Sequence, residues 1–201
     1  MPPPMPDSPR LRNAAATRQA MLIAARRHFA RESYENVGLR EIAGDAGVDP
    51  SLVSRYFGGK EQLFREALRG DKKPMLEGVD RVGLADHLAS MLLEDIGADG
   101  EDPSAHVDRL LILLRSSSSP MASEIVREAI HEDVLEPMAN LLEGEDAEMR
   151  ASLSLAVLMG SGILRSAMGV DPMCHGNNAK LRERLIALFS VALGGAVLPP
   201  G

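Results

Sequence analysis

The side chains best suited to chemistry lie on one face of a short helix expected over residues 50–57. They are small or basic and rich in hydrogen-bonding groups: Pro50, Ser51, Ser54 and Arg55. An arginine presents two N–H groups that match the O6 and N7 acceptors of guanine, and serine hydroxyls fit base edges or phosphate oxygens. This face therefore predicts contact with double-stranded DNA. The alternative is a solvated charged surface.

Residues that would carry catalysis or bind a metal do not cluster in the sequence. It has no phosphate-binding loop, no nucleophile elbow and no paired-histidine zinc helix. Its one cysteine, Cys174, precedes His175 in a loop rich in Gly, Asn and Pro. Adjacency in sequence does not create the geometry of a nucleophile and its base. We therefore expect no enzyme, no metal and no cofactor, with redox sensing by Cys174 as a minor alternative.

The elements around this face form a predicted helix-turn-helix over about residues 38–57. A short helix over 39–46 ends at Gly47, because glycine adopts the left-handed conformation that ends helices. Asp49 then caps the second helix, with Pro50 at its first position. A longer helix over 17–31, with Thr17 as its N-cap, precedes this pair, and a helix over 60–69 follows it. In such a motif the second helix lies in the DNA major groove.

The order of these elements resembles the N-terminal domain of TetR/AcrR-family transcription regulators. The resemblance spans residues 17–64 and rests on the joint spacing of Thr17-Arg18, Ala24-Ala25, Phe29-Ala30, Tyr34, Ile42-Ala43, Ala46-Gly47-Val48, Pro50-Ser51-Leu52-Val53, Arg55-Tyr56-Phe57 and Lys60-Glu61-Gln62-Leu63-Phe64. The chain departs from the family pattern at His28, Gly38 and Ser54, where the family usually has a Leu, a helix-capping Thr or Ser, and a Tyr.

The resemblance implies a set of DNA-binding residues. They are Thr17, Leu39, Arg40, Pro50, Ser51, Ser54, Arg55, Tyr56 and Lys60. Within this set, Ser51, Ser54 and Arg55 are expected near base edges. Thr17, Tyr56 and Lys60 are expected near phosphates. Because Gly38 has no side chain, only the backbone N–H groups of Leu39 and Arg40 could contact phosphate at that helix start.

Charge separates the N-terminal part of the chain from the rest. Residues 1–70 carry eleven basic and eight acidic side chains, whereas residues 71–201 carry eleven and twenty-one. A basic N-terminal part fits a polyanionic partner. We expect a disordered basic arm over 1–13, a DNA-binding domain over 14–73 and a second domain over 74–201. No secretory signal is recognised and residues 151–164 are interpreted as a buried helix rather than a membrane span, so the expected location is the cytoplasm.

The second part is expected to be helical throughout, which makes the protein all-α with about nine helices. Apolar spacing predicts helices over residues 84–96, 104–115, 121–142 with a kink at Pro137, 146–168 and 178–193. Breakers separate them, among them a loop over 169–177. The helix over 60–69 is expected to be the one short mechanical connection between the two parts.

A ligand pocket is implied by the resemblance, since family members of this plan hold a small molecule among the central helices. The run from Leu110 to Leu114 is apolar on all faces, which fits a helix facing a cavity or one buried in a core. Methionines in this part could line an adaptable cavity. The possible lining residues are Leu111, Arg115, Met121, Met138, Met159 and Arg165.

A homodimer interface is expected on the last two helices. Small residues along 151–162 would permit close helix approach, and an apolar stripe follows in the last helix. In the family, two such helices pair with their copies; packing within one chain is the alternative. The expected interface residues are Leu153, Val157, Gly160, Leu164, Leu181, Leu185, Leu188, Phe189 and Ala192.

These features together predict a sequence-specific DNA-binding transcription regulator. The expected mode is repression from a palindromic operator, released when a small hydrophobic or amphipathic ligand binds. Two alternatives stay open: a transcriptional activator, and a ligand-binding helical protein without operator binding.

Overall fold

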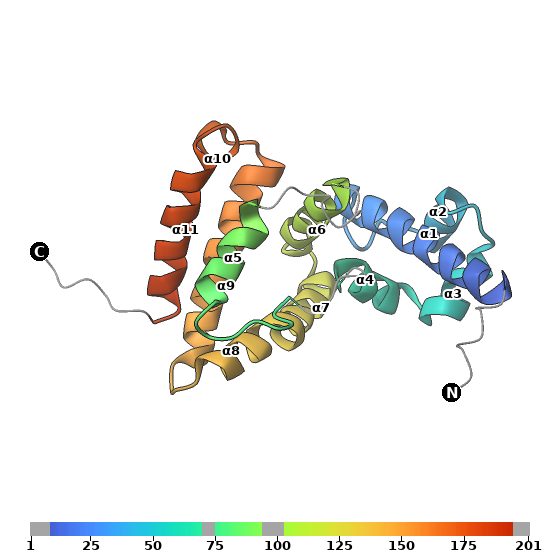
Figure 1. Cartoon of the computed structure of the whole chain (residues 1–201). Coiled ribbons are helices and arrows are strands. Elements are labelled where there is room, and N and C mark those ends of the chain that lie inside the picture. The colour runs from blue at the N-terminus through green and yellow to red at the C-terminus, as the bar shows by residue number, and fades with distance from the viewer. Residues whose placement is uncertain (1–8, 70–74, 94–102, 195–201) are drawn as a thin grey trace, which may run out of the picture. The chain divides into compact units, whose positions relative to one another are not determined.

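The structure is a computed structural model that describes residues 9–69, 75–93 and 103–194 (Figure 1). These ranges contain helices and turns and no strand, which confirms the predicted all-α class. Four helices make up the N-terminal part: α1 (Pro9–Arg31), α2 (Leu39–Asp45), α3 (Pro50–Phe57) and α4 (Lys60–Arg69). Their bounds match the expected elements except at the start of α1.

The first helix is longer than the sequence pattern predicts. It begins at Pro9, so Thr17 lies inside α1 and is not its N-cap, and residues 9–13 of the predicted disordered arm are helical. Proline is tolerated at a first helical position because its missing N–H has no partner there in any helix. The remainder of the predicted arm, residues 1–8, lies outside the described residues.

The turn between α2 and α3 follows the predicted chemistry. Gly47 has φ = 67°, a left-handed conformation that costs other residues energy. Asp49 caps α3 by accepting a hydrogen bond from the backbone N–H of Ser51, and Pro50 is the first helical residue. Gly58, with φ = 77°, ends α3. These three signals fix the length of α3 to about two turns.

Aromatic rings pin the core of the N-terminal part. Phe29 of α1 and Phe64 of α4 meet edge to face with ring centroids 4.8 Å apart, and Tyr34 contacts both rings. Arg26 is also buried, and its Nε donates a 3.1 Å hydrogen bond to the backbone carbonyl of Ala67 in α4. Edge-to-face aromatic pairs add to the free energy gained by burial, so α1 and α4 form a firm support for the helix-turn-helix.

The remaining helices are α5 (Leu84–Leu93), α6 (Pro103–Ser116), α7 (Pro120–Ile130), α8 (Glu136–Leu142), α9 (Ala147–Gly162), α10 (Asp171–Cys174) and α11 (Asn178–Ala192). The predicted single helix over 121–142 is divided, because a π-helical turn, His131–Leu135, separates α7 from α8. The irregularity thus lies just before Pro137, where it accommodates the proline. A second π turn, Ile163–Ala167, follows α9, and α10 lies in the segment expected to be a loop.

A second hydrophobic core lies among α5, α8, α9 and α11. Figure 1 shows α5, α9 and α11 side by side. Leu84, Leu88 and Met138 are fully buried there together with Leu185 and Phe189 of α11. Met138 is therefore a core residue, and Leu185 and Phe189 pack within the chain rather than on a free surface.

Contacts divide the chain into two compact units, and the division differs from a single cut at residue 73. One unit joins residues up to 70 with Leu111–Ile125, and the other holds residues 71–110 and 126–201. Helices α6 and α7 each contain residues of both units. The chain therefore passes between the units three times, so α4 is not the one connection that the sequence suggested.

Candidate DNA-binding site

The solvent-facing side of α3 carries the side chains predicted to contact DNA. Pro50, Ser51, Ser54 and Arg55 are exposed, and so is Arg40 of α2. On the other side of α3, side chains buried in the core hold the helix in place; these are Val53 and Phe57. The amphipathic pattern thus leaves hydroxyl groups and a guanidinium free to meet an external partner. Leu39 and Tyr56 lie at the edges of this surface and are half-buried.

Asp49 determines which hydrogen-bonding groups Ser51 can offer. Oδ1 of Asp49 accepts a bond from the Ser51 backbone N–H at 2.9 Å and one from the Ser51 hydroxyl at 2.5 Å. These hydrogen bonds lower the pKa of Asp49, so its side chain is a carboxylate that can only accept. The Ser51 hydroxyl therefore spends its one proton on Asp49 and presents oxygen lone pairs outward.

The start of α2 carries an acidic group that the sequence analysis missed. Oε2 of Glu41 accepts a 3.2 Å hydrogen bond from the backbone N–H of Gly38. The signal was present in the sequence, because a Glu three residues after the capping position commonly reaches back in this way. Phosphate contact by the backbone N–H groups of Leu39 and Arg40 stays a prediction, now with a carboxylate nearby.

Two of the predicted phosphate contacts are placed elsewhere. The Lys60 ammonium lies 4.7 Å from the centre of the Tyr34 ring and donates a 3.3 Å hydrogen bond to the backbone carbonyl of Glu35. Its partial burial lowers the pKa of Lys60. Thr17 is half-buried within α1. Both residues therefore support the N-terminal unit, and neither side chain is freely exposed.

Other polar contacts in this unit were not foreseen. Arg18 pairs with Glu66 of α4 and lies 5.0 Å from the ring centre of Phe57, so it joins α1 to α3 and α4. His28 was interpreted as a packed residue, and its Nε2 lies 2.7 Å from Oδ2 of Asp45 at the end of α2. Neither pairing has a signature in the sequence, since both partners are far apart along the chain.

The predicted ligand-pocket residues are not brought together by the described structure. Three belong to the first unit and three to the second: Leu111, Arg115 and Met121, then Met138, Met159 and Arg165. Arg115 donates a 2.8 Å hydrogen bond to the carbonyl of Ala30, and Arg165 donates to the carbonyl of Met173. Met121 is exposed, while Met159 and Leu111 are half-buried. A hollow of about 310 Å³ in the first unit is lined by none of them; its lining is Ala20, Ile23, Ala24, Arg27, Asp45 and Ala46.

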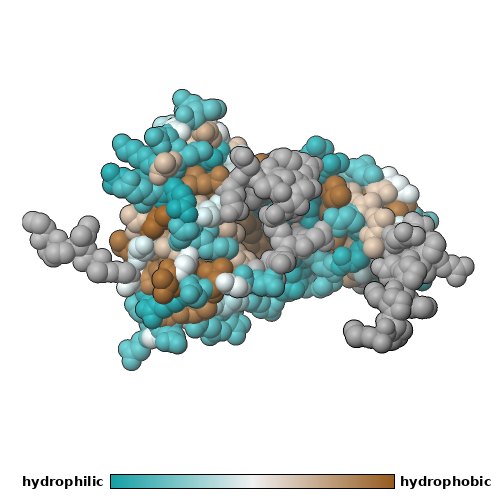
Figure 2. All heavy atoms as spheres, in the orientation of Figure 1, coloured by the Kyte–Doolittle hydropathy of each residue, from teal (hydrophilic) through white to brown (hydrophobic). Residues whose placement is uncertain are grey.

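The predicted dimer surface divides into an exposed part and a buried part. Leu153, Leu164 and Leu188 are 41–54% exposed, and Val191 joins them at 56%. Val157, Gly160, Leu181 and Ala192 are half-buried. The stripe of α11 is wide enough to serve two surfaces, with Leu185 and Phe189 turned to the core. Figure 2 shows hydrophobic residues at the surface of this part of the molecule, between hydrophilic ones.

The helical stretch Ala147–Ala167 is long and apolar enough to cross a membrane by length and composition, and 22% of it is buried within the chain. The expectation that this segment is a buried helix is therefore wrong for the single chain. An apolar helix with so much free surface suits contact with another apolar surface. Among the described residues, no group of three His, Cys, Asp or Glu side chains could hold a metal ion.

A basic helix-turn-helix presented by an all-α chain defines a DNA-binding regulator. The sequence profile described as "Bacterial regulatory proteins, tetR family" matches residues 22–67, and the profile "Tetracyclin repressor-like, C-terminal domain" matches residues 84–193. The second match alone covers more than half of the chain. The protein belongs to the tetR family of bacterial regulatory proteins. This family consists of transcription regulators that bind operator DNA as homodimers and respond to small molecules; they are not enzymes, and as a class they are cytoplasmic.

Individual relatives agree with this assignment. The HTH-type transcriptional repressor AcnR of Corynebacterium efficiens is 30% identical over 147 residues, which are 71% of this chain and 73% of that protein. Salmonella enterica GusR has a similar fold, with a TM-score of 0.65 at 19% identity over 88% of this chain and 95% of that one. NalD, the secondary repressor of the MexAB-OprM multidrug efflux pump in Pseudomonas aeruginosa, gives 0.60 at 21% identity over 85% and 95%.

Proposed function

We propose that this protein is a cytoplasmic transcriptional repressor that binds a palindromic operator as a homodimer and leaves it when a small hydrophobic or amphipathic ligand binds. The observation that carries the proposal is the solvent-facing side of α3, where Ser51, Ser54 and Arg55 stand free of the core. A helix of two turns held by Val53 and Phe57 fits the major groove, in which each base pair presents a distinct pattern of donors and acceptors.

Dimerisation is supported by the free apolar surface of α9 and α11. Leu153, Leu164, Leu188 and Val191 would each gain from burial against a second copy. A Cβ added to Gly160 would meet no atom of its own chain within 4 Å, so the α9 backbone is open to close approach there. A twofold interface repeats the same patch on both subunits, and a palindrome repeats the same half-site.

Repression is supported by the relatives, because AcnR is named a transcriptional repressor and NalD a repressor of an efflux pump. The test is a gel-shift titration with the DNA upstream of the protein's own gene, paired with a reporter driven by the same DNA. Binding together with reduced reporter expression is expected. Binding with increased expression would make the protein an activator, and no binding at any salt concentration would contradict operator recognition.

Release by a ligand is tested by calorimetry of candidate hydrophobic compounds, with and without the bound operator. A ligand changes an equilibrium only through its different affinities for the two states, so DNA and ligand must weaken each other's binding by the same factor. Typical couplings are about 1–3 kcal/mol. A compound that binds equally well in both titrations occupies the protein without being its inducer.

A further inference from the structure

The turn between α6 and α7 is fastened to the DNA-binding unit. Residues 111–125 belong to the same compact unit as α1–α4, although both helices continue into the other unit. Arg115, in the last turn of α6, donates a 2.8 Å hydrogen bond from Nε to the carbonyl of Ala30. That carbonyl lies in the last turn of α1, where backbone acceptors lack partners within the helix and favour a positive charge.

A second contact is made four residues further along the chain. The Ser119 hydroxyl donates a hydrogen bond to the carboxylate of Glu35, in the loop between α1 and α2. Ser119 is buried, and its Oγ also accepts a 3.0 Å bond from the backbone N–H of Ala122, which caps α7. The hydrogen bond from Ser119 lowers the pKa of Glu35 and so keeps it charged. A hydrogen bond to an ionised acceptor is stronger than one between neutral groups.

Glu35 is thereby held from two sides. Lys60, at the start of α4, binds its backbone carbonyl, while Ser119 binds its side chain. The loop then passes through buried Val37 and enters α2 at Leu39. Any displacement of the α6–α7 turn is thus applied to the segment that leads directly into the helix-turn-helix.

We propose that Arg115, Ser119 and Glu35 are positioning residues that set the placement of the helix-turn-helix through the α6–α7 turn. This inference rests on the proposed function. Because α6 and α7 continue into the unit that carries the dimer surface, the fastened loop restricts the orientations available to each DNA-binding unit. The two α3 helices of a dimer are therefore held at one preferred separation.

The test uses DNA duplexes of different half-site spacing. The probes are the duplex that the wild-type protein selects from a random pool and two derivatives, with one base pair added or removed at the centre. The variants are Glu35→Ala and Arg115→Met. Glu35→Gln keeps a hydrogen-bond acceptor, Asn36→Ala alters an exposed neighbour in the same loop, and Ser117→Ala removes a hydroxyl that bonds only within its own turn. All three serve as controls.

The two fastening variants should bind the selected duplex about tenfold more weakly, since they lose one charge-assisted hydrogen bond, and should lose most of their preference over the altered spacings. The controls should keep that preference. Hydrogen exchange of the free protein should be faster at residues 32–37 in Glu35→Ala than in Glu35→Gln. An equal loss on all three duplexes, or wild-type spacing preference in both variants, would overturn the positioning role while leaving operator binding intact. Failure of the wild-type protein to select any duplex would overturn the proposed function itself.

Discussion

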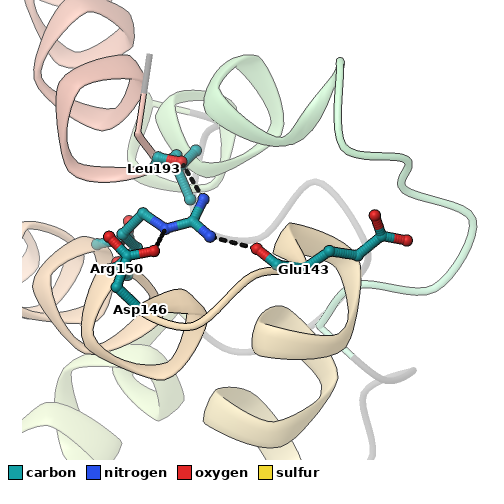
Figure 3. Close-up of polar contacts among 5 residues, drawn as sticks. Glu143, Asp146, Arg150 and Leu193 are labelled. Atoms are coloured by element: carbon teal, nitrogen blue, oxygen red, sulfur yellow. Dashed lines mark hydrogen bonds and ion pairs between the residues drawn. The ribbon is translucent and has the colours of Figure 1, made fainter. Parts of the chain in front are cut away.

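Arg150 donates a 3.1 Å hydrogen bond from Nη1 to the backbone carbonyl of Leu193, the residue that caps the C-terminus of α11 (Figure 3). Its other guanidinium nitrogens bind the carbonyl of Glu143, just after α8, and the carboxylate of Asp146. One arginine of α9 thus satisfies carbonyls at the ends of two other helices. Arginine suits this site because its planar group presents several donors in a fixed arrangement.

Arg150→Met should lower the free energy of unfolding by roughly 2–3 kcal/mol, because hydrogen bonds from a charged donor to two carbonyls are lost. The matched control is Arg182→Met. Arg182 pairs with Asp86 at 2.7 Å, but both side chains are about half exposed, so its removal should cost less than about 1 kcal/mol. Urea unfolding measures both values. Equal losses would show that the site around Arg150 contributes no more than a surface ion pair.

Leu188→Glu should convert the protein to a monomer at micromolar concentration. Leu188 is 54% exposed in the single chain, so the glutamate is solvated in the monomer and buried without a partner in a dimer. Val82→Glu is the control, since Val82 is 92% exposed in a turn before α5. Sedimentation velocity gives the association state. A Leu188→Glu protein that remains dimeric would remove α11 from the interface.

Arg55→Ala and Arg40→Ala should weaken DNA binding in different ways. If Arg55 bonds a guanine edge, its loss costs about 1–3 kcal/mol and relaxes the preference at one base pair of each half-site. A phosphate contact by Arg40 would instead weaken all sequences alike and reduce the slope of log affinity against log salt by about 0.9 per phosphate. Anisotropy titrations on single-substitution duplexes separate the two patterns. Uniform loss in Arg55→Ala would assign it to the backbone.

Ser51 should prefer a base that donates a hydrogen bond. Its proton is engaged by Asp49, so the oxygen can accept from the amino group of adenine or cytosine and cannot donate to guanine or thymine. Asp49→Asn keeps a capping group but weakens that engagement, so the preference at the contacted base pair should broaden. Ser51→Ala should abolish it. Sequencing of duplexes bound by each variant reports the change, and an unaltered guanine or thymine at that position in all three proteins would refute this polarity.

The elements of the DNA-binding unit could be predicted closely wherever a local signal marks them. Asp49, Pro50 and Gly58 define both ends of α3, since capping, fixed φ and a left-handed conformation act within a few residues. The start of α1 was placed too late because Thr17 offered a plausible cap, while the stronger signal was Pro9 at a first helical position. The π turn before Pro137 has no comparable signature.

Long-range polar contacts could not be predicted in the same way. Arg115 was expected in a ligand pocket, and the structure shows its guanidinium on a carbonyl 85 residues away in sequence. Lys60 was expected at a phosphate and is held by Tyr34 and Glu35. Hydrophobic spacing identified the apolar side chains of α11, but spacing alone does not distinguish Leu188, which is exposed, from Phe189, which is buried. The tertiary partner decides each case.

The most direct test of the central claim is selection of bound duplexes from a random-sequence pool by the purified full chain, followed by sequencing. The account predicts enrichment of one inverted repeat whose half-sites lie about one helical turn apart, since a twofold dimer would present two copies of α3. Binding should fall steeply as salt rises. No enriched sequence, or an enriched site without twofold symmetry, would contradict operator recognition by a dimeric helix-turn-helix.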